Sequence, residues 1–325
     1  MRKRQRGVAL LVVLLVLVLM VTISADITQR NGWTYLRTVG QIDQLQAKWY
    51  GRAAEDMIRR ILHRDKQNSP QKTHLAQSWA RTEHLFHVER GEVRGQIIDA
   101  QACFNLNAIN QGGTEQDSTP YPARVFRQLL LNLELEPLHA TQVTAALRDW
   151  VDTNNDSLTG SSEDEKYTTL DVSYLAASHS IQDVSELRVV SGVDANLYRK
   201  LLPYVCVLPT SSLLVNINTL RESQGALLAA LFLNDLDNFP AAKLLQKRPR
   251  TGWDSVATFL TLPQLKEMET AAAIPNLTVN SDYFITYFDV IMGGRQFSQH
   301  NLMIWNGKNF HTIQRKSGLT MMVAP

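Results

Sequence analysis

The chain has 325 residues, and beyond the first 25 its composition is that of an ordinary globular protein. At about 100–200 residues per domain, this length allows more than one hydrophobic core. The formal net charge is only +2 at pH 7, so no global basic field predicts binding to nucleic acid.

The first 25 residues consist of a basic segment followed by an apolar one. Residues 8–25 contain no charged side chain, and as an α-helix they would extend about 27 Å at 1.5 Å per residue. That length is close to the ~30 Å thickness of a bilayer core. The basic residues before the run, and Asp26 after it, orient the N-terminus toward the cytoplasm and the rest of the chain outside. These basic residues are Arg2, Lys3, Arg4 and Arg6.

The helical pattern continues beyond the apolar run. Apolar residues recur at intervals of three and four, and the first proline is Pro70. This spacing predicts one helix from about Val8 to about Arg64. A secretory signal cleaved before Asp26 is the alternative, but the apolar core of such signals is usually only about 7–15 residues long. The spaced apolar residues are Ile42, Leu45, Trp49, Ala53, Met57 and Ile61.

The leader "MRKRQRG", followed by a hydrophobic helix that continues as an amphipathic one, resembles the N-terminal signal of type IV pilins and pseudopilins. The resemblance implies that a prepilin peptidase cleaves after Gly7 and that Val8 becomes the methylated N-terminus of the mature chain. It also implies that the hydrophobic helix is retained, holds the protein in the inner membrane, and then packs with partner helices in a filament.

One position departs from the pilin pattern. Pilins carry glutamate at the fifth residue of the mature chain, where this sequence has Val12. A carboxylate among apolar helices is costly unless it has a cationic partner, and Val12 needs none. A subunit without this charge suits the first position in a filament, the tip. The missing charge and the length of the chain resemble the K-type minor pseudopilins of type II secretion systems.

The remainder of the chain changes from strands to helices and back to strands. Residues 83–100 are predicted to form a hairpin that turns at Arg90-Gly91. Residues 103–274 show a mostly helical pattern. Strands return from Thr278, with turns at "MGGR" and at the Asn-Gly of "WNGK".

We therefore expect an α+β fold, in which a pilin-like long N-terminal helix lies on an antiparallel sheet and a large, mostly helical domain is inserted between strands. K-type pseudopilins are known for such an insertion. The expected division is a leader at 1–7, a transmembrane segment at 8–25, the pilin helix and first hairpin at 26–102, the inserted domain at 103–275 and the C-terminal strands at 276–325.

The insertion contains a weak internal sequence repeat. "CFNLNAIN" at 103–110 recurs as "LLVNINTL" at 213–220, and an apolar helix follows each. An N-x-N motif before a helix supplies side-chain acceptors for the first helical N–H groups, so we interpret the two as duplicated helical units. Cys103 and Cys206 both precede these motifs, which makes them a candidate disulfide pair. Two buried reduced thiols are the alternative.

The acidic stretch 149–171 is the one segment with site chemistry. Counted from Asp152, oxygen-bearing side chains occupy the EF-hand ligand positions 1, 3, 5 and 12, although position 6 is Ser157 instead of glycine. A solvated acidic loop is the alternative. K-type pseudopilins are known to bind calcium in the inserted domain, so the resemblance implies a structural calcium site here. The candidate ligands are Asp152, Asn154, Asp156, Glu163, Asp164 and Asp171.

Other motifs give no support for catalysis or DNA binding. Residues 184–205 resemble a helix-hairpin-helix, but Asp194 places a negative charge where a DNA phosphate would lie. The sequence has no G-x-x-x-x-G-K-[ST], H-E-x-x-H or G-x-S-x-G motif. We expect neither an enzymatic activity nor a nucleic-acid partner.

The resemblance implies a minor pseudopilin that caps a pseudopilus and supports export of folded proteins from the periplasm across the outer membrane. Its partners would be I-type and J-type minor pseudopilins, contacted through residues such as Ile42, Leu45 and Trp49. The chain would cross the inner membrane once, with its head in the periplasm. Two alternatives remain: a secreted, calcium-stabilised enzyme or binding protein with a cleaved signal peptide, and a tip pilin of a type IV pilus.

Overall fold

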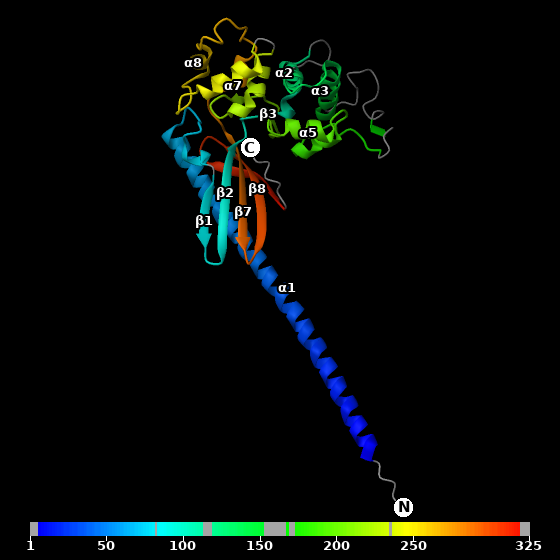
Figure 1. The fold of residues 1–325 in the computed structure, drawn as a ribbon. Coiled ribbons are helices and arrows are strands. Elements are labelled where there is room, and N and C mark those ends of the chain that lie inside the picture. Colours follow the sequence, from blue (N-terminus) through cyan, green and yellow to red (C-terminus); the bar gives the residue numbers. More distant parts are fainter. Residues whose placement is uncertain are drawn as a thin grey trace, which may run out of the picture.

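The structure is a computed structural model that describes residues 6–81, 83–112, 119–152, 167–168, 173–233 and 236–318. Its longest element is the helix α1 (Arg6–Asn68), which has 63 residues and is about 95 Å long at 1.5 Å per residue. The expected single helix is confirmed. The first half of α1 projects away from the rest of the molecule, and the second half lies along the sheet (Figure 1).

The sheet has five antiparallel strands in the order β1-β2-β7-β8-β9. The predicted hairpin at 83–100 is confirmed as β1 and β2, and the strands predicted after residue 278 are confirmed as β7, β8 and β9. The turn between β7 and β8 consists of Gly293 and Gly294, whose φ angles of 55° and 75° favour glycine. The strands are β1 (His84–Val88), β2 (Gly91–Asp99), β7 (Tyr283–Met292), β8 (Arg295–Trp305) and β9 (Phe310–Ser317).

One face of the sheet packs on the second half of α1. Every second residue of β7 is buried, and these side chains form a cluster with residues of α1 that include Ile58 and Leu62. Helix and sheet approach closely at Gly51, where the Phe288 ring lies 3.3 Å from the position that a Cβ would occupy. A long helix on an antiparallel sheet is the expected pilin-like arrangement, so the predicted α+β fold is confirmed.

The helical domain is inserted between β2 and β7, which are hydrogen-bonded neighbours in the sheet. The chain therefore leaves the sheet and returns to it at adjacent positions, and the domain lies beyond the end of the sheet that is farthest from the N-terminus (Figure 1). Its α-helices are α2 (Tyr121–Asn132), α3 (Pro137–Val151), α5 (Ala195–Leu201), α6 (Gly225–Leu231), α7 (Asn238–Gln246) and α8 (Val256–Leu260). The shorter 3₁₀ segments of the chain are η1 (Ser78–Ala80), η2 (Leu106–Ala108), η3 (Val184–Val189), η4 (Glu222–Gln224) and η5 (Ile274–Asn276).

Two short parallel strand pairs divide the helical domain into two similar halves. In the first half β3 (Phe104–Asn105) pairs with β4 (Val205–Cys206), and in the second β5 (Val215–Asn216) pairs with β6 (Leu277–Thr278). The second half therefore ends with β6, at Thr278. This is slightly beyond residue 275, where the inserted domain was predicted to end.

The two N-x-N motifs begin these halves in the same way. The Asn105 side chain accepts a hydrogen bond from the backbone N–H of Asn107 at 3.3 Å. The Asn216 side chain accepts one from the backbone N–H of Asn218 at 2.9 Å. The predicted side-chain acceptor at each N-x-N motif is confirmed, whereas the duplication of the two units stays an interpretation.

A disulfide lies where the helical domain meets the sheet. Cys103 and Cys206 are covalently bonded, with their Cα atoms 5.8 Å apart. A small apolar cluster surrounds the pair and includes Ala100, Leu208 and the β8 residue Leu302. The bond therefore joins the first strand pair of the helical domain at the point where that domain rests on the sheet.

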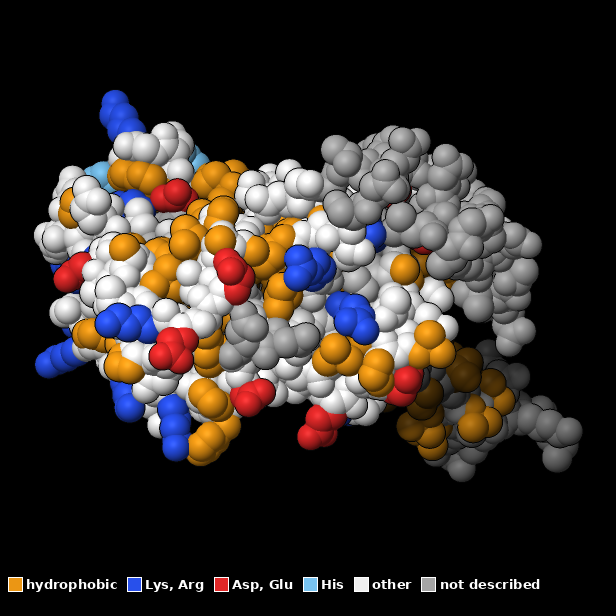
Figure 2. All heavy atoms as spheres, turned by 90° about the horizontal axis from the view of Figure 1, so that it is seen from above, with side chains coloured by type: hydrophobic (Ala, Val, Ile, Leu, Met, Phe, Trp, Pro, Cys, Tyr) orange, Lys and Arg blue, Asp and Glu red, His pale blue; other side chains and the backbone are white. Residues whose placement is uncertain are grey.

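A view from above shows the outer face of the helical domain (Figure 2). On the part of this face that is coloured by type, acidic and basic side chains are interspersed among hydrophobic ones. The apolar end of α1 is visible beyond the outline of the head. The coloured part of this face thus shows no large field of one sign.

Candidate functional site

Residues 8–25 of α1 form an apolar rod that is exposed to solvent in the part of the chain that the structure describes. Val8 is 61% exposed, and the large apolar side chains that follow it are exposed to a similar degree as far as Ile27. Among the described residues, α1 is the one helix long and apolar enough to cross a membrane. Gly7, the predicted cleavage position, lies in the first turns of this helix. Cleavage after Gly7 would remove only the basic leader and leave the apolar rod on the mature chain.

The second half of α1 has two apolar faces. One is buried on the sheet and consists of small and branched residues. The other is exposed to solvent, with Ile42 46%, Leu45 60%, Trp49 66% and Met57 43% exposed. At about 100° of rotation per residue, the two faces are centred roughly 160° apart on the helix. The buried face consists of Ala47, Ala54, Ile58 and Leu62.

We call the exposed face, Ile42, Leu45, Trp49 and Met57, the α1 stripe. A helix that is apolar on two opposite sides can pack on its own sheet and on a second protein at the same time. Within the stripe, the guanidinium of Arg52 lies over one face of the Trp49 ring, 5.1 Å from the ring centre. The large apolar surface that stays exposed is typical of a protein–protein contact.

A buried carboxylate holds α1 in its orientation on the sheet. The side chain of Glu55 is 4% exposed and is bound by Arg315 of β9, at N–O distances of 2.7 and 2.8 Å. Thr312 donates a further hydrogen bond to it at 2.6 Å. Burial by itself would raise the pKa of Glu55, but hydrogen bonds from Arg315 and Thr312, together with the charges of Arg315 and Arg59, hold that pKa below its usual value. The pairing keeps one face of α1 inward and the stripe outward.

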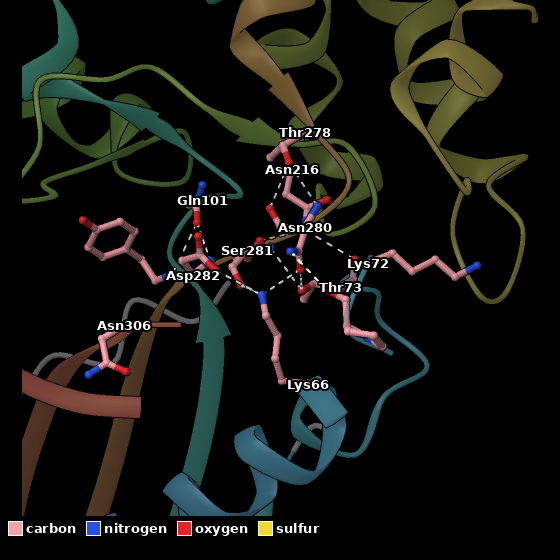
Figure 3. A network of polar contacts seen from close by, with 12 residues as sticks. Lys66, Lys72, Thr73, Gln101, Asn216, Thr278, Asn280, Ser281, Asp282 and Asn306 are labelled. Atoms are coloured by element: carbon pink, nitrogen blue, oxygen red, sulfur yellow. Dashed lines mark hydrogen bonds and ion pairs between the residues drawn. The ribbon is translucent and has the colours of Figure 1, made fainter. Parts of the chain in front are cut away.

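A second polar network joins the end of α1 to the helical domain (Figure 3). Lys66 reaches from the last turn of α1 to the segment that enters β7. Its ammonium group donates to the Asn280 side chain at 2.9 Å, to the Ser281 carbonyl at 3.0 Å and to the Asp282 carboxylate at 3.0 Å. Thr73 also donates to the Asn280 side chain, at 3.0 Å. These contacts fix the helical domain relative to α1.

The carboxylate of Asp99 lies at the centre of this junction and is 4% exposed. It accepts hydrogen bonds from the hydroxyl groups of Ser281 at 2.5 Å and Thr219 at 2.6 Å, and from the Asn216 amide at 3.1 Å. Burial raises the pKa of Asp99, and the hydrogen bonds from these groups and from the Gln101 backbone oppose the rise. Asp99 ends β2, Ser281 precedes β7, and the other two donors belong to the second half of the helical domain, so this one side chain joins sheet and insertion.

The predicted calcium ligands can be placed only in part. Asp152 caps the C-terminal end of α3 and is half-buried. The remaining candidates, Asn154, Asp156, Glu163, Asp164 and Asp171, lie outside the described residues. Within the described ranges, no group of three or more His, Cys, Asp or Glu side chains is placed to hold a metal ion.

Sequence reasoning did not identify Glu55 or Asp99. Their partners are far away in the chain, at separations of 260 residues for Arg315 and 182 for Ser281. A signal existed for Glu55, because it follows Ala54 and precedes Ile58 and Leu62 on the buried face of α1. A carboxylate on the core face of a helix requires a cationic or hydrogen-bonding partner.

Comparisons with known proteins agree with this architecture. Two family profiles, both described as type II secretion system (T2SS) protein K, match residues 102–210 and 215–280. The boundary between the two matched regions coincides with the boundary between the two halves of the helical domain, since β4 ends at Cys206 and β5 begins at Val215.

Two relatives match over nearly the whole chain. A type II secretion system protein K of Klebsiella pneumoniae is 49% identical over 320 residues, which cover 98% of this chain and 98% of the relative. The protein of the same name from Pectobacterium carotovorum subsp. carotovorum is 44% identical over 328 residues, with 100% of both chains covered.

A solved structure has the same fold. It is a chain from the crystal structure of the GspK-GspI-GspJ complex of the enterotoxigenic Escherichia coli type 2 secretion system, with a TM-score of 0.80 and 32% sequence identity. The match covers 87% of this chain and 100% of that chain.

Proposed function

The chain belongs to the type II secretion system protein K family, and from this premise we propose that it caps the tip of the pseudopilus in a complex with I-type and J-type minor pseudopilins. In this role it supports export of folded proteins from the periplasm across the outer membrane. The work is assembly, and we propose no catalytic step.

The observation that carries the proposal is the α1 stripe. A solvent-exposed apolar face on a rigidly held helix supplies the central apolar contact that a specific interface needs. The solved structure of similar fold is a complex with I-type and J-type proteins, which identifies the partner class. Ile42, Leu45 and Trp49 are the residues that we expect to be buried on assembly.

Two further features favour the tip over a position in the shaft. Val12 removes the carboxylate through which a pilin-type helix would pair with the N-terminus of an earlier subunit. The helical domain extends the head at the end farthest from the N-terminus (Figure 1). A wide domain there leaves less room for another subunit above it.

We also propose that the basic leader is removed by a prepilin peptidase after Gly7, that Val8 is then methylated, and that residues 8–25 cross the inner membrane with the head in the periplasm. Mass spectrometry of the mature N-terminus tests this step. A methylated Val8 supports it, whereas a chain that begins at Asp26 would favour a cleaved secretory signal.

A structural calcium ion in the acidic segment is a further proposal, supported by the ligand spacing from Asp152 to Glu163. When bound, the ion would neutralise carboxylates that otherwise repel one another.

Calcium at 100 times its Kd should stabilise the full chain by about 2.7 kcal/mol, and the double variant Asp156→Asn/Glu163→Gln should lose that gain. Magnesium at the same concentration and the variant Asp56→Asn on α1 serve as controls. An unfolding temperature that does not respond to calcium would refute the site.

The tip assignment is tested with the full chain, in detergent, together with purified I-type and J-type partners. We expect a three-component complex, and labelled protein at one end of assembled pseudopili only. Label along the shaft would contradict the tip position. Loss of protein export, with surface pili unaffected, in a strain without this chain would separate the secretion role from that of a type IV pilus tip.

A further inference from the structure

A groove of about 650 Å³ runs between the second half of α1 and the edge strand β1. Met57 and Ile61 of α1 and Phe86 of β1 give it an apolar lining. None of these three side chains is fully buried, since Met57 is 43% exposed and the other two are half-buried. The groove is therefore an apolar surface that the fold of the chain leaves partly uncovered.

The rim of the groove is basic. Arg60 and Arg64 project from α1, and Arg81 from the segment before β1, and all three are exposed. Asp56 also lines the groove, but its carboxylate pairs with Arg59 at 2.6 Å. Among the described residues, none of the three rim guanidinium groups forms an ion pair. They are available to a carboxylate from another molecule.

The groove continues the α1 stripe. Met57 belongs to both, and Arg60 and Arg64 follow it on the same side of the helix at intervals of three and seven residues. A partner helix that packs on Trp49 and runs roughly parallel to α1, with the two axes about 8–10 Å apart, therefore meets Met57 about two turns further on. It meets Arg60 and Arg64 about three and four turns beyond Trp49.

We propose that this groove receives the N-terminal helix of a neighbouring pseudopilin subunit, which packs apolar side chains on Met57 and Ile61 and places a carboxylate against Arg60 and Arg64. The inference rests on the proposed function for the class of partner. It adds a charge requirement, because the partner helix must be acidic where it leaves the apolar stripe.

The charge pair gives the contact a defined register. The stripe by itself is a continuous apolar surface, on which a partner helix could slide by a turn at little cost. A carboxylate held by two guanidinium groups at one end removes that freedom, since arginine binds carboxylates through directional, charge-assisted hydrogen bonds. The stripe supplies apolar contact and the groove sets the position along α1.

The test measures binding of the full chain, in detergent, to a mixture of purified I-type and J-type partners at low and moderate ionic strength. The variant Arg60→Glu/Arg64→Glu should weaken binding at least tenfold at low salt and remove most of the salt dependence seen with the unmodified chain. Both side chains are exposed, so the unfolding temperature should stay within about 2 °C of the original.

The control variant is Arg199→Glu/Lys247→Glu, which makes the same change in charge at exposed positions of the helical domain. It should bind within twofold of the unmodified chain. Equal binding by the Arg60→Glu/Arg64→Glu chain would overturn the groove proposal and leave the proposed function intact. Failure of the unmodified chain to bind the partners would instead refute the proposed function.

Discussion

Glu55 of α1 and Arg315 of β9 form a two-pronged ion pair between residues that are 260 positions apart in the chain. The carboxylate is 4% exposed, whereas the arginine side chain is 55% exposed. The pair therefore extends from the buried face of α1 to the surface of an edge strand. It connects the N-terminal helix to the last strand of the sheet, and so fixes which face of α1 is left for other proteins.

We expect Glu55→Gln to lower the free energy of unfolding by about 1.5–3 kcal/mol, because it replaces hydrogen bonds to a charged acceptor. The pKa of Glu55 is held below its usual value of 4.5, so its contribution is present above that pH and is lost as the pH falls through the lowered pKa. The stability difference between the two chains should therefore shrink as the pH falls from 7 toward 3. Thermal unfolding of the full chain in detergent measures it, with the exposed Asp56→Asn as control, and an equal difference at both pH values would contradict the assignment.

The α1 stripe provides the second prediction. Trp49→Glu should leave the unfolding temperature unchanged, because the side chain is 66% exposed, yet weaken binding to the I-type and J-type partners. Loss of a central aromatic contact typically costs about 2 kcal/mol or more, which is roughly 30-fold in affinity. Leu138→Glu, at a 65% exposed position on α3, is the matched control and should bind normally. If both variants bind alike, the stripe is not the contact surface.

The disulfide provides the third prediction. Cys103 and Cys206 are separated by 103 positions, and chain-entropy theory gives about 4.7 kcal/mol for closing a loop of roughly 100 residues. The double variant Cys103→Ala/Cys206→Ala should therefore lose about 2–5 kcal/mol of stability. A reductant should lower the unfolding temperature of the original chain and have no effect on the variant. A reductant-insensitive original chain would mean that the two thiols are not bonded in the purified protein.

The long helix and the strands could be predicted because each has a periodic apolar pattern and defined ends. The packing of α1 could not, since the helix is apolar on two opposite faces. The sequence makes Ile42, Leu45 and Trp49 conspicuous because they are large. The sheet packs instead on the side that carries Ala47 and Gly51, where small residues let helix and strands approach closely.

The polar junctions were beyond prediction for a different reason. The N-x-N motifs could be interpreted as helix starts because that contact is local, from Asn105 to Asn107. The Asp99 site needs Thr219 and Ser281, which are 120 and 182 positions away. A pattern within one segment cannot predict a contact between residues so far apart. These side chains meet only in the folded chain, because the insertion returns to the sheet beside the strand from which it began.

Asn107 and Asn218, the second asparagines of the two motifs, have equivalent roles that the local pattern does not reveal. The Asn107 side chain donates to the Ile181 carbonyl at 2.9 Å and accepts from the Ile181 N–H at 2.8 Å. The Asn218 side chain donates to the Trp253 carbonyl at 3.0 Å and accepts from the Trp253 N–H at 2.8 Å. Each amide thus forms a reciprocal pair of hydrogen bonds with one distant backbone residue, once in each half of the domain.

This equivalence makes the last prediction a paired one. Asn107→Ala and Asn218→Ala each leave a buried backbone N–H and a buried C=O without a partner, at about 1–3 kcal/mol for each group. We therefore expect both variants to lose about 2–6 kcal/mol of stability, and by similar amounts, since both side chains are buried. Asn196→Ala, at an exposed position of α5, is the control and should change stability by less than about 0.5 kcal/mol. If only one of the two variants loses stability, the equivalence is contradicted. The same hydrogen bonds would then stabilise only one half of the domain.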